Sequence, residues 1–152
     1  AHEVIEAWPQ GGVHIVSLND FLKRVSGGHD QPNGFYLGIL KADYRSLAEE
    51  AASRMEGFLG LPYNDSFDWN KDRFYCSELV SFGYADLTRG MKRERGGLFS
   101  PKPMYFGKKS STAFRVWKDY FTDIGLEVPK NQPGVSPLGI YLEGQKSLFV
   151  KP

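Results

Sequence analysis

Alternating and β-branched apolar residues open the chain and predict a β-hairpin. The runs at residues 4–7 and 13–16 flank a segment that contains the turn residues Pro and Gly. Ser17 follows, and its hydroxyl can accept a free backbone N–H at the start of a helix over residues 18–25. We therefore expect a hairpin followed directly by a short helix.

Apolar residues at helical spacing predict two longer helices in the middle of the chain. A loop over residues 26–34 and a buried strand over residues 35–40 precede them. The first helix is predicted over residues 44–59 and ends at Gly60, a residue type that commonly follows a helix. The second is predicted to run from Cys76 to about Thr88.

The C-terminal part of the chain predicts two further helices. Ser110 or Ser111 can cap the first, whose apolar stripe is more typical of a core or lid than of a cofactor site and contains Phe114, Val116, Trp117, Tyr120 and Phe121. Ser136 followed by Pro137 is a favourable start for the second, because proline suits the first helical position.

The segments around these two helices give weaker signals. Residues 96–107 contain two prolines and predict a loop, and residues 147–150 are expected to return to the sheet. The segment 91–135 carries no pattern that assigns it a chemical role. Its length suits an insertion that gates the access of substrate.

Charge and composition argue against several functional classes. The 152 residues carry a formal net charge of +1, and no basic cluster alternates with aromatic residues, so we expect no nucleic-acid partner. No apolar run is long enough to cross a bilayer. One cysteine and three scattered histidines give neither an internal disulfide nor the spacing of a zinc site. We expect one domain over residues 1–152, with no cofactor.

Three aspartates in the aromatic, acidic loop over residues 61–74 raise the question of calcium. Asp65, Asp68 and Asp72 lack the alternating ligand spacing and the central glycine of an EF-hand loop, so we do not expect a calcium site. The aromatic residues of the same loop can form either an apolar wall for a substrate or part of the core.

The only cysteine, Cys76, begins the second predicted helix. Unpaired N–H groups and the helix dipole stabilise an anion there, so we expect its thiol to ionise more easily than free cysteine, whose pKa is about 8.5. The same N–H groups can hold the oxyanion that forms when a thiolate attacks a carbonyl. Free cysteine is also among the most buried residue types, so position alone leaves an inert core residue open.

The residues around Cys76 resemble a known family. Residues 57–84, GFLGLPYNDSFDWNKDRFYCSELVSFGY, look like the segment "helix, LGxPYD, aromatic and acidic loop, YCSE, helix" of the YiiX/YaeF-type proteins, a bacterial branch of the NlpC-type papain-like superfamily. Residues 4–21 are similar to the hairpin and helix of that family, which begin with V-x-E-A, and residues 135–137 resemble a further element. The similarity follows most of the chain in the right order.

This resemblance implies a fold class, an activity and a set of site residues. The fold is an α+β, circularly permuted papain-like one, with a small antiparallel sheet packed against helices. The activity is that of a thiol hydrolase, acting on amide or acyl bonds in small peptide, peptidoglycan-like or lipid-conjugated substrates. Cys76 corresponds to the nucleophile, Glu6 to the carboxylate that orients the catalytic histidine, and Tyr75 and Tyr63 to residues that line the site. The family also suggests a bacterial cell envelope or periplasm.

The catalytic histidine of the family has no counterpart in this sequence. In the family it lies on a strand before the Glu6 strand, so we expect the active protein to carry an N-terminal strand segment upstream of the first residue. His2 shares a strand face with Glu6, but four residues at about 3.3 Å each separate them by roughly 13 Å. His14 would face Glu6 directly if Ala7 pairs with Val13.

Two other functional classes remain open. One is a catalytically inactive relative that binds peptide or lipid in the same cleft, which the missing histidine favours. The other is a structural α+β domain with an inert core cysteine, in which Glu6 is simply on the solvated side of a strand. A hydrolase requires a reactive thiol, a binding protein can keep an ordinary accessible one, and a core cysteine resists reagents until the protein unfolds.

Overall fold

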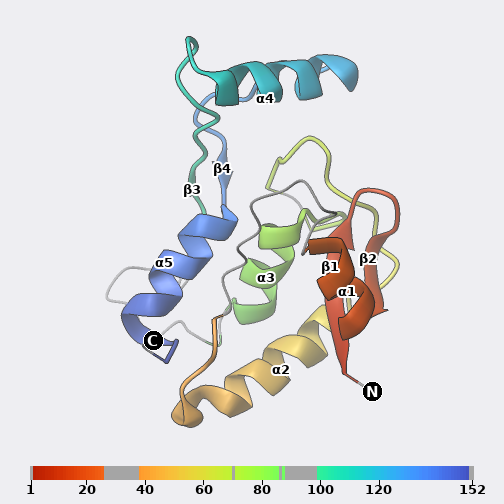
Figure 1. The fold of residues 1–152 in the computed structure, drawn as a ribbon, viewed down its shortest axis with the longest axis vertical. Helices are drawn as coiled ribbons and strands as arrows, with labels where there is room; N and C mark the ends of the chain where they lie inside the picture. The colour runs from red at the N-terminus through yellow and green to blue at the C-terminus, as the bar shows by residue number, and fades with distance from the viewer. Residues whose placement is uncertain (1, 26–37, 70, 86, 88–98, 151–152) are drawn as a thin grey trace.

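A β-hairpin and the helix that begins with the only cysteine lie side by side in the computed structural model (Figure 1). The structure describes residues 2–25, 38–69, 71–85, 87 and 99–150. The hairpin consists of β1 (Glu3–Trp8) and β2 (Gly12–Ser17), and α1 (Leu18–Val25) follows directly. The cysteine helix is α3 (Cys76–Tyr84), with the hairpin on one side and α5 (Pro137–Ser147) on the other.

The hairpin has the register in which Ala7 pairs with Val13, so Glu6 faces His14 across the two strands. The predicted cap of α1 is also confirmed, because the hydroxyl of Ser17 accepts the backbone N–H of Asp20 at 3.1 Å. Both features are local, and the hairpin and short helix predicted from the sequence are therefore correct.

The helix before the acidic loop is shorter than predicted. It comprises a 3₁₀ turn, η1 (Ala42–Tyr44), and α2 (Arg45–Glu56). Hydrogen-bonded turns continue past its end, and Gly60 then adopts a positive φ of 85°. The helix that begins at Cys76 also ends early, at Tyr84, because Ala85 takes an extended backbone conformation.

The predicted buried strand over residues 35–40 is wrong where the structure describes it. Residues 35–37 lie outside the described residues, and Leu40 makes only a single antiparallel bridge with Phe149. Ile39 is 58% exposed, so the apolar run is not buried on both faces. The return of residues 147–150 is limited to this bridge, and they do not join β1 and β2. The bridge ties the C-terminal segment to the residues that precede η1 and α2.

The C-terminal helix predictions are confirmed. Ser111 caps α4 (Thr112–Asp123) by accepting the N–H of Phe114 at 3.1 Å, and Ser136 caps α5 by accepting the N–H of Gly139 at 3.0 Å. The predicted loop over residues 96–107 contains a strand, β3 (Lys102–Pro103), and its residues 96–98 lie outside the described residues. β3 pairs antiparallel with β4 (Pro133–Gly134).

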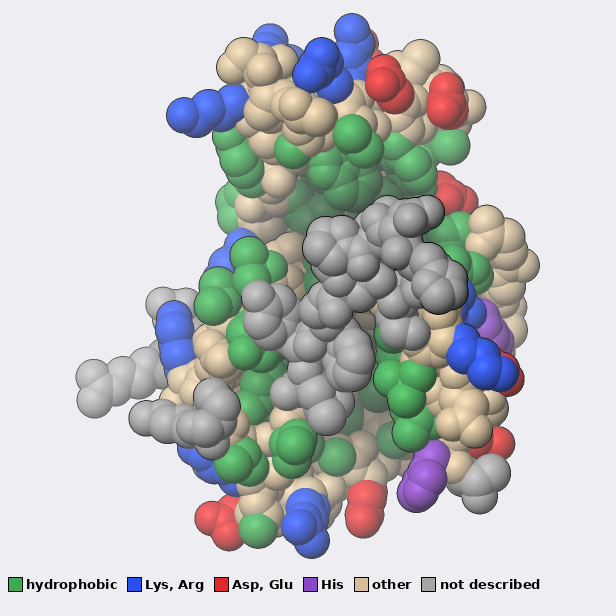
Figure 2. Space-filling view, viewed as in Figure 1, with side chains coloured by type: hydrophobic (Ala, Val, Ile, Leu, Met, Phe, Trp, Pro, Cys, Tyr) green, Lys and Arg blue, Asp and Glu red, His purple; other side chains and the backbone are tan. Residues whose placement is uncertain are grey.

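Aromatic side chains hold α4 against the acidic loop. Phe67, whose φ is positive at 54°, has its ring centroid 5.3 Å from that of Trp117 and 5.8 Å from that of Tyr120. The hydroxyl of Tyr120 also donates to a carboxylate oxygen of Asp65 at 3.0 Å. Hydrophobic side chains gather beneath α4, while charged ones cover its opposite side (Figure 2). Trp117, Tyr120 and Phe121 of the predicted apolar stripe are therefore used in packing, whereas Val116 is 62% exposed.

Two clusters of buried apolar residues contribute to the core of the described part of the chain. Ala7, Val13, Phe74 and Leu79 join the hairpin to α3, and Phe99 with Leu148 forms a second cluster near α5. None of the described helices is long and apolar enough to cross a membrane. The helix α3 contributes to the first cluster and also contacts α5, so its position is fixed from two sides.

Gly12 provides a test of how the hairpin is attached to the acidic loop. Its φ is +61°, and a Cβ there would overlap the carbonyl oxygen of Leu61, which accepts the N–H of Val13 at 2.8 Å. We expect Gly12→Ala to lower the free energy of unfolding by about 2–4 kcal/mol, measured by urea denaturation, because backbone strain and a steric clash add. Gly60→Ala is the matched control, since Gly60 also has positive φ but a Cβ added to it would meet no other atom within 4 Å. Its cost should stay near 1–2 kcal/mol, roughly the strain alone; equal costs would contradict the role of Leu61.

Candidate active site

Cys76 occupies the first position of α3, as the sequence predicted. The preceding residue, Tyr75, has extended backbone angles, with φ −88° and ψ 164°, and it is the N-cap of the helix. Its backbone N–H donates to the carboxylate of Glu78 at 3.3 Å. A glutamate three residues after the cap is the acidic half of a capping box, and it fixes the angle at which the chain enters the helix.

The carboxylate of Glu78 is fully buried and belongs to a network that sequence reasoning missed. The side-chain amide of Asn64 donates to it at 3.0 Å and also donates to the carbonyl of Asp68. The backbone N–H of Asn64 donates to the carbonyl of Phe74 at 3.2 Å. The loop over residues 61–74 is thereby tied to the start of α3. The sequence did contain a signal for this network, because a glutamate three residues after the cap residue commonly accepts the backbone N–H of that residue.

A second set of hydrogen bonds joins the helix start to the segment that follows β4. The hydroxyl of Tyr75 accepts the N–H of Val135 at 2.9 Å, and the hydroxyl of Ser77 donates to the carbonyl of Val135 at 2.7 Å. Both backbone polar groups of Val135 are thus bound by the residues on either side of Cys76. A Cβ on Gly134 would lie 2.8 Å from the Tyr75 hydroxyl, so only glycine fits closely there.

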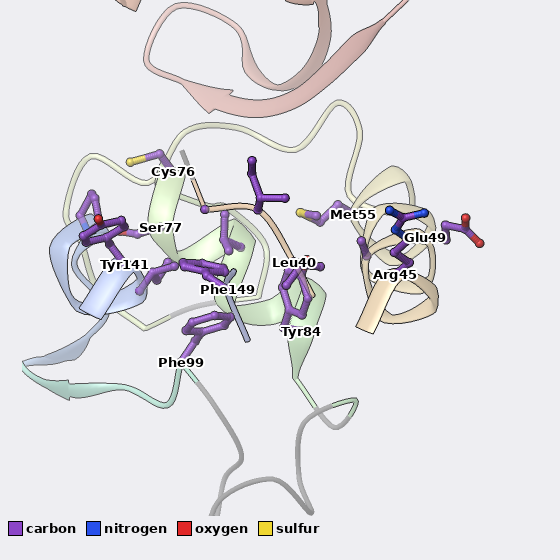
Figure 3. Close-up of a pocket in the computed structure, with 16 residues that line it drawn as sticks. Leu40, Arg45, Glu49, Met55, Cys76, Ser77, Tyr84, Phe99, Tyr141 and Phe149 are labelled. Carbon is purple, nitrogen blue, oxygen red and sulfur yellow. The ribbon is translucent and has the colours of Figure 1, made fainter. Parts of the chain in front are cut away.

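Cys76 lies at the junction of two cavities. The larger, of about 820 Å³, lies between α2, α3 and α5 (Figure 3). The smaller, of about 490 Å³, lies between α3 and the segments of β3 and β4. Four residues line both cavities: Cys76, Ser77, Phe99 and Pro137. A carbonyl group beside the thiol would therefore have space on both of its sides.

The structure brings both predicted tyrosines to the smaller cavity with Cys76. Tyr75 is only 1% exposed, and its hydroxyl is bound to Val135, so it supports the wall from behind. Tyr63 is half-buried, and its ring centroid lies 6.4 Å from that of Phe67. Desolvation raises the pKa of both tyrosines, and they stay protonated at neutral pH.

The expected lowering of the Cys76 pKa is wrong in net direction. Desolvation by the surrounding protein raises the pKa of the thiol, although the side chain is exposed on one side. The backbone N–H groups of Ser77 and Cys76 and the Ser77 side chain lower the pKa, but their effect is smaller than that of desolvation. The helix N-terminus therefore supplies the predicted donors without making the thiol acidic.

Glu6 and His14 form a separate cluster on the hairpin. The Nε2 atom of His14 lies 3.1 Å from a carboxylate oxygen of Glu6, and its Nδ1 atom lies 3.0 Å from the carbonyl oxygen of Gly12. Arg24 donates to both carboxylate oxygens of Glu6 and lies over the Trp8 ring, 4.4 Å from its centroid. Both imidazole nitrogens thus face acceptors on the hairpin.

The hairpin cluster does not reach the cavities around Cys76. Neither Glu6 nor His14 is among the residues that line them, and the described lining residues include no histidine. His2 is exposed near the start of β1. The structure thus joins Glu6 to His14 as the hairpin register predicted, but it does not join either residue to Cys76.

Asp65 and Asp68 of the acidic loop interact with other side chains of the protein. Asp68 forms an ion pair with Arg73 at 2.7 Å, and Asp65 accepts the hydroxyl of Tyr120. Desolvation raises the pKa of Asp68, but hydrogen bonds from Arg73 and other neighbours outweigh it, so the net shift is downward. Among the described residues, no group of three His, Cys, Asp or Glu side chains could hold a metal ion.

Comparison with known proteins gives two matches. A family model described as "Permuted papain-like amidase enzyme, YaeF/YiiX, C92 family" matches residues 1–132. The crystal structure of the metalloprotein YiiX from Escherichia coli O157:H7 is similar, with a TM-score of 0.59 and 23% sequence identity. That alignment covers 99% of this chain and 76% of the YiiX chain, and it supports the fold. No curated protein matches the chain.

The raised pKa of Cys76 predicts how its reactivity depends on pH. We expect the alkylation rate of the folded chain by iodoacetamide to keep rising through pH 9, whereas the urea-denatured chain should titrate near the free-thiol value of about 8.5. Because the folded state holds the proton more tightly, the free energy of unfolding should also fall as the pH rises above about 8.5. A folded rate that levels off well below pH 8 would contradict this and indicate an activating group.

Substitution of Glu78 tests the network that positions the cysteine. Glu78→Ala leaves the N–H of Tyr75 and the amide of Asn64 without this acceptor, and we expect it to lower the free energy of unfolding by about 2–4 kcal/mol. The matched control is Glu50→Ala on α2, where the carboxylate is exposed and pairs with Arg54 at 3.3 Å. That change should cost about 0–0.5 kcal/mol in the same urea titration. Similar costs for the two variants would refute the proposed importance of the buried carboxylate.

Proposed function

The chain belongs to the family of permuted papain-like amidases of the YaeF/YiiX type, and from this premise we propose that it is a thiol hydrolase with Cys76 as its nucleophile. The predicted fold class, an α+β permuted papain-like fold, is confirmed by the family match and the structural similarity. Its proposed substrates are amides or acyl conjugates of small molecules such as peptides. The family match supports an amidase. The roles of Cys76 and of the residues around it are what we propose.

The observation that carries this proposal is the position of Cys76 at a helix start that opens to two cavities. The backbone N–H groups of Cys76 and Ser77 belong to the first turn of α3, and they favour negative charge at the sulfur. When the sulfur bonds to a carbonyl carbon, the oxygen develops negative charge close to the same donors. The cavities on both sides leave room for the acyl and amine parts of an amide. A structural core cysteine requires neither the donors nor the space.

The proposed reaction proceeds through a thioester. A base removes the proton of the Cys76 thiol, the sulfur attacks the carbonyl carbon, and the C–N bond breaks as the amine takes up a proton. Water then attacks the thioester, releasing a carboxylate and regenerating the thiol. The family resemblance assigns the base to a histidine oriented by Glu6. In the arrangement seen here, His14 contacts Glu6 and Gly12 on the hairpin and does not line either cavity at Cys76.

A second candidate function is supported by the state of the thiol. Its pKa is raised, and the described residues lining the two cavities include no histidine. These properties fit a relative that binds peptide or acyl ligands in the same cavities without cleaving them. Both candidates predict that the cavities bind these ligands, but only the hydrolase cleaves them.

A panel of N-acetyl dipeptides and N-acyl amino acids tests the hydrolase, with amine release measured by fluorescamine. We expect Cys76→Ala and Cys76→Ser to lower kcat/KM by about 10³-fold or more, because either change removes the nucleophile. Glu6→Gln should lower it by about 10–10⁴-fold, as loss of an orienting carboxylate does. Ser53→Ala, an exposed change on α2, is the control for general effects. No release by the unmodified chain, together with saturable binding of the same compounds, would favour the non-catalytic relative.

A further inference from the structure

One segment of the chain extends from the rest of the molecule as an arm. We define the arm as residues 102–134, which run from β3 through α4 to β4, and we call the other described residues the body. Figure 1 shows α4 at one end of the molecule, joined to the body by β3 and β4. Among the described residues, the backbone-to-backbone hydrogen bonds of residues 104–132 have both partners within the arm. The arm is thus attached to the body by a narrow two-stranded ribbon.

The arm rests on the body mainly through the ring of Phe67, in the acidic loop. Four rings of the arm surround it, with centroids 5.3–6.5 Å from its own: Phe106, Trp117, Tyr120 and Phe121. The hydroxyl of Tyr120 also donates to a carboxylate oxygen of Asp65 at 3.0 Å. The arm makes these contacts with side chains, so they can break without any change in the hydrogen bonds of α4.

Phe67 is held in a strained backbone conformation. Its φ of 54° lies in the left-handed region, which is unfavourable for a residue with a bulky side chain. The N–H of Phe67 donates to the carbonyl of Asn64 at 3.2 Å, and the side-chain amide of Asn64 donates to the carbonyl of Asp68. Loss of the ring contacts would let Phe67 relax. Ring packing and backbone strain therefore act in opposite directions on the contact between arm and body.

The arm covers the smaller cavity and not the larger one. Seven of the residues that line the smaller cavity belong to the arm: Lys102, Pro103, Met104, Tyr105, Phe106, Trp117 and Gly134. Tyr63, Phe67 and Cys76 line the same cavity from the body. No residue of the arm lines the larger cavity. Movement of the arm would therefore change access to one side of Cys76 and leave the other side as it is.

From these contacts we infer that the arm is a lid over the smaller cavity. Phe67 and the hydrogen bond between Tyr120 and Asp65 form its latch, and it turns about the β3–β4 ribbon to admit a ligand next to Cys76. Closure removes water from the cavity, as active-site lids do. The sequence suggested gating by residues 91–135, of which residues 91–98 lie outside the described residues. The inference does not depend on the proposed hydrolysis, because a binding protein requires the same entry.

Spin labels on the arm and the body test whether the lid opens. They are attached through Lys118→Cys on α4 and Ser53→Cys on α2, both exposed positions, in the Cys76→Ala chain. With the latch intact, double electron–electron resonance should give mainly one distance, that of the closed lid. Phe67→Ala removes the ring that contacts four rings of the arm, and we expect it to raise the population at longer distances about tenfold or more. Tyr120→Phe keeps the ring but loses the hydrogen bond, and it should raise this population about two- to tenfold.

Two controls separate an opening lid from a damaged one. Tyr105→Ala removes a ring of the arm that is 74% exposed, and it should leave the distances unchanged. A second label pair, at Lys109→Cys and Asp123→Cys, lies entirely within the arm. Its distance should stay the same in Phe67→Ala, because the lid moves as a unit.

Three outcomes would overturn the inference. The first is a distance between the labels on α2 and α4 that neither Phe67→Ala nor Tyr120→Phe changes. The second is an equal effect of Tyr105→Ala, since opening would then not depend on the latch. The third is a changed distance within the arm in Phe67→Ala, which would indicate that the arm unfolds instead of opening. None of these measurements requires turnover, so failure of the proposed hydrolysis would leave the test of the lid unaffected.

Discussion

The buried carboxylate of Glu78 holds the start of α3, and the geometry of the site depends on it. Burying a carboxylate is unfavourable unless hydrogen bonds replace its hydration. Here the N–H of Tyr75 and the side-chain amide of Asn64 supply them. The same contacts unite the helix cap with the acidic loop, so the loop and the helix cannot move independently. Cys76 is placed by residues that need not contact a substrate.

The four residues of the YCSE motif, at positions 75–78, differ in burial and therefore in role. Tyr75, Ser77 and Glu78 are buried, while Cys76 is exposed. The two residues that flank the cysteine bind the two backbone polar groups of Val135. This brings a C-terminal segment next to a residue near the middle of the chain. It also forms a wall of the smaller cavity, so one short motif creates the helix start and part of the binding space.

Local signals in the sequence predicted most of the fold and part of the candidate site. The three serine caps are correct, because a cap requires only a hydroxyl and a backbone N–H three residues later. The strand predicted over residues 35–40 is wrong for the described residues 38–40, because pairing depends on a distant partner and periodicity does not show that Leu40 forms a single bridge with Phe149. Cys76 and both tyrosines lie at one cavity because they belong to one continuous motif. The network of Glu78 and the direction of the thiol pKa were missed, since burial and desolvation follow from tertiary contacts.

Desolvation at Cys76 has two opposite consequences for catalysis. It raises the pKa of the thiol, which reduces the fraction of thiolate at neutral pH. It also lowers the effective dielectric constant around the N–H groups of Cys76 and Ser77, so each hydrogen bond to a developing oxyanion becomes stronger. A ligand that fills the cavities beside Cys76 would increase both effects, because it removes further water. The proposed hydrolysis therefore depends on a base that removes the thiol proton, and in that proposal the helix N-terminus acts mainly on the oxyanion.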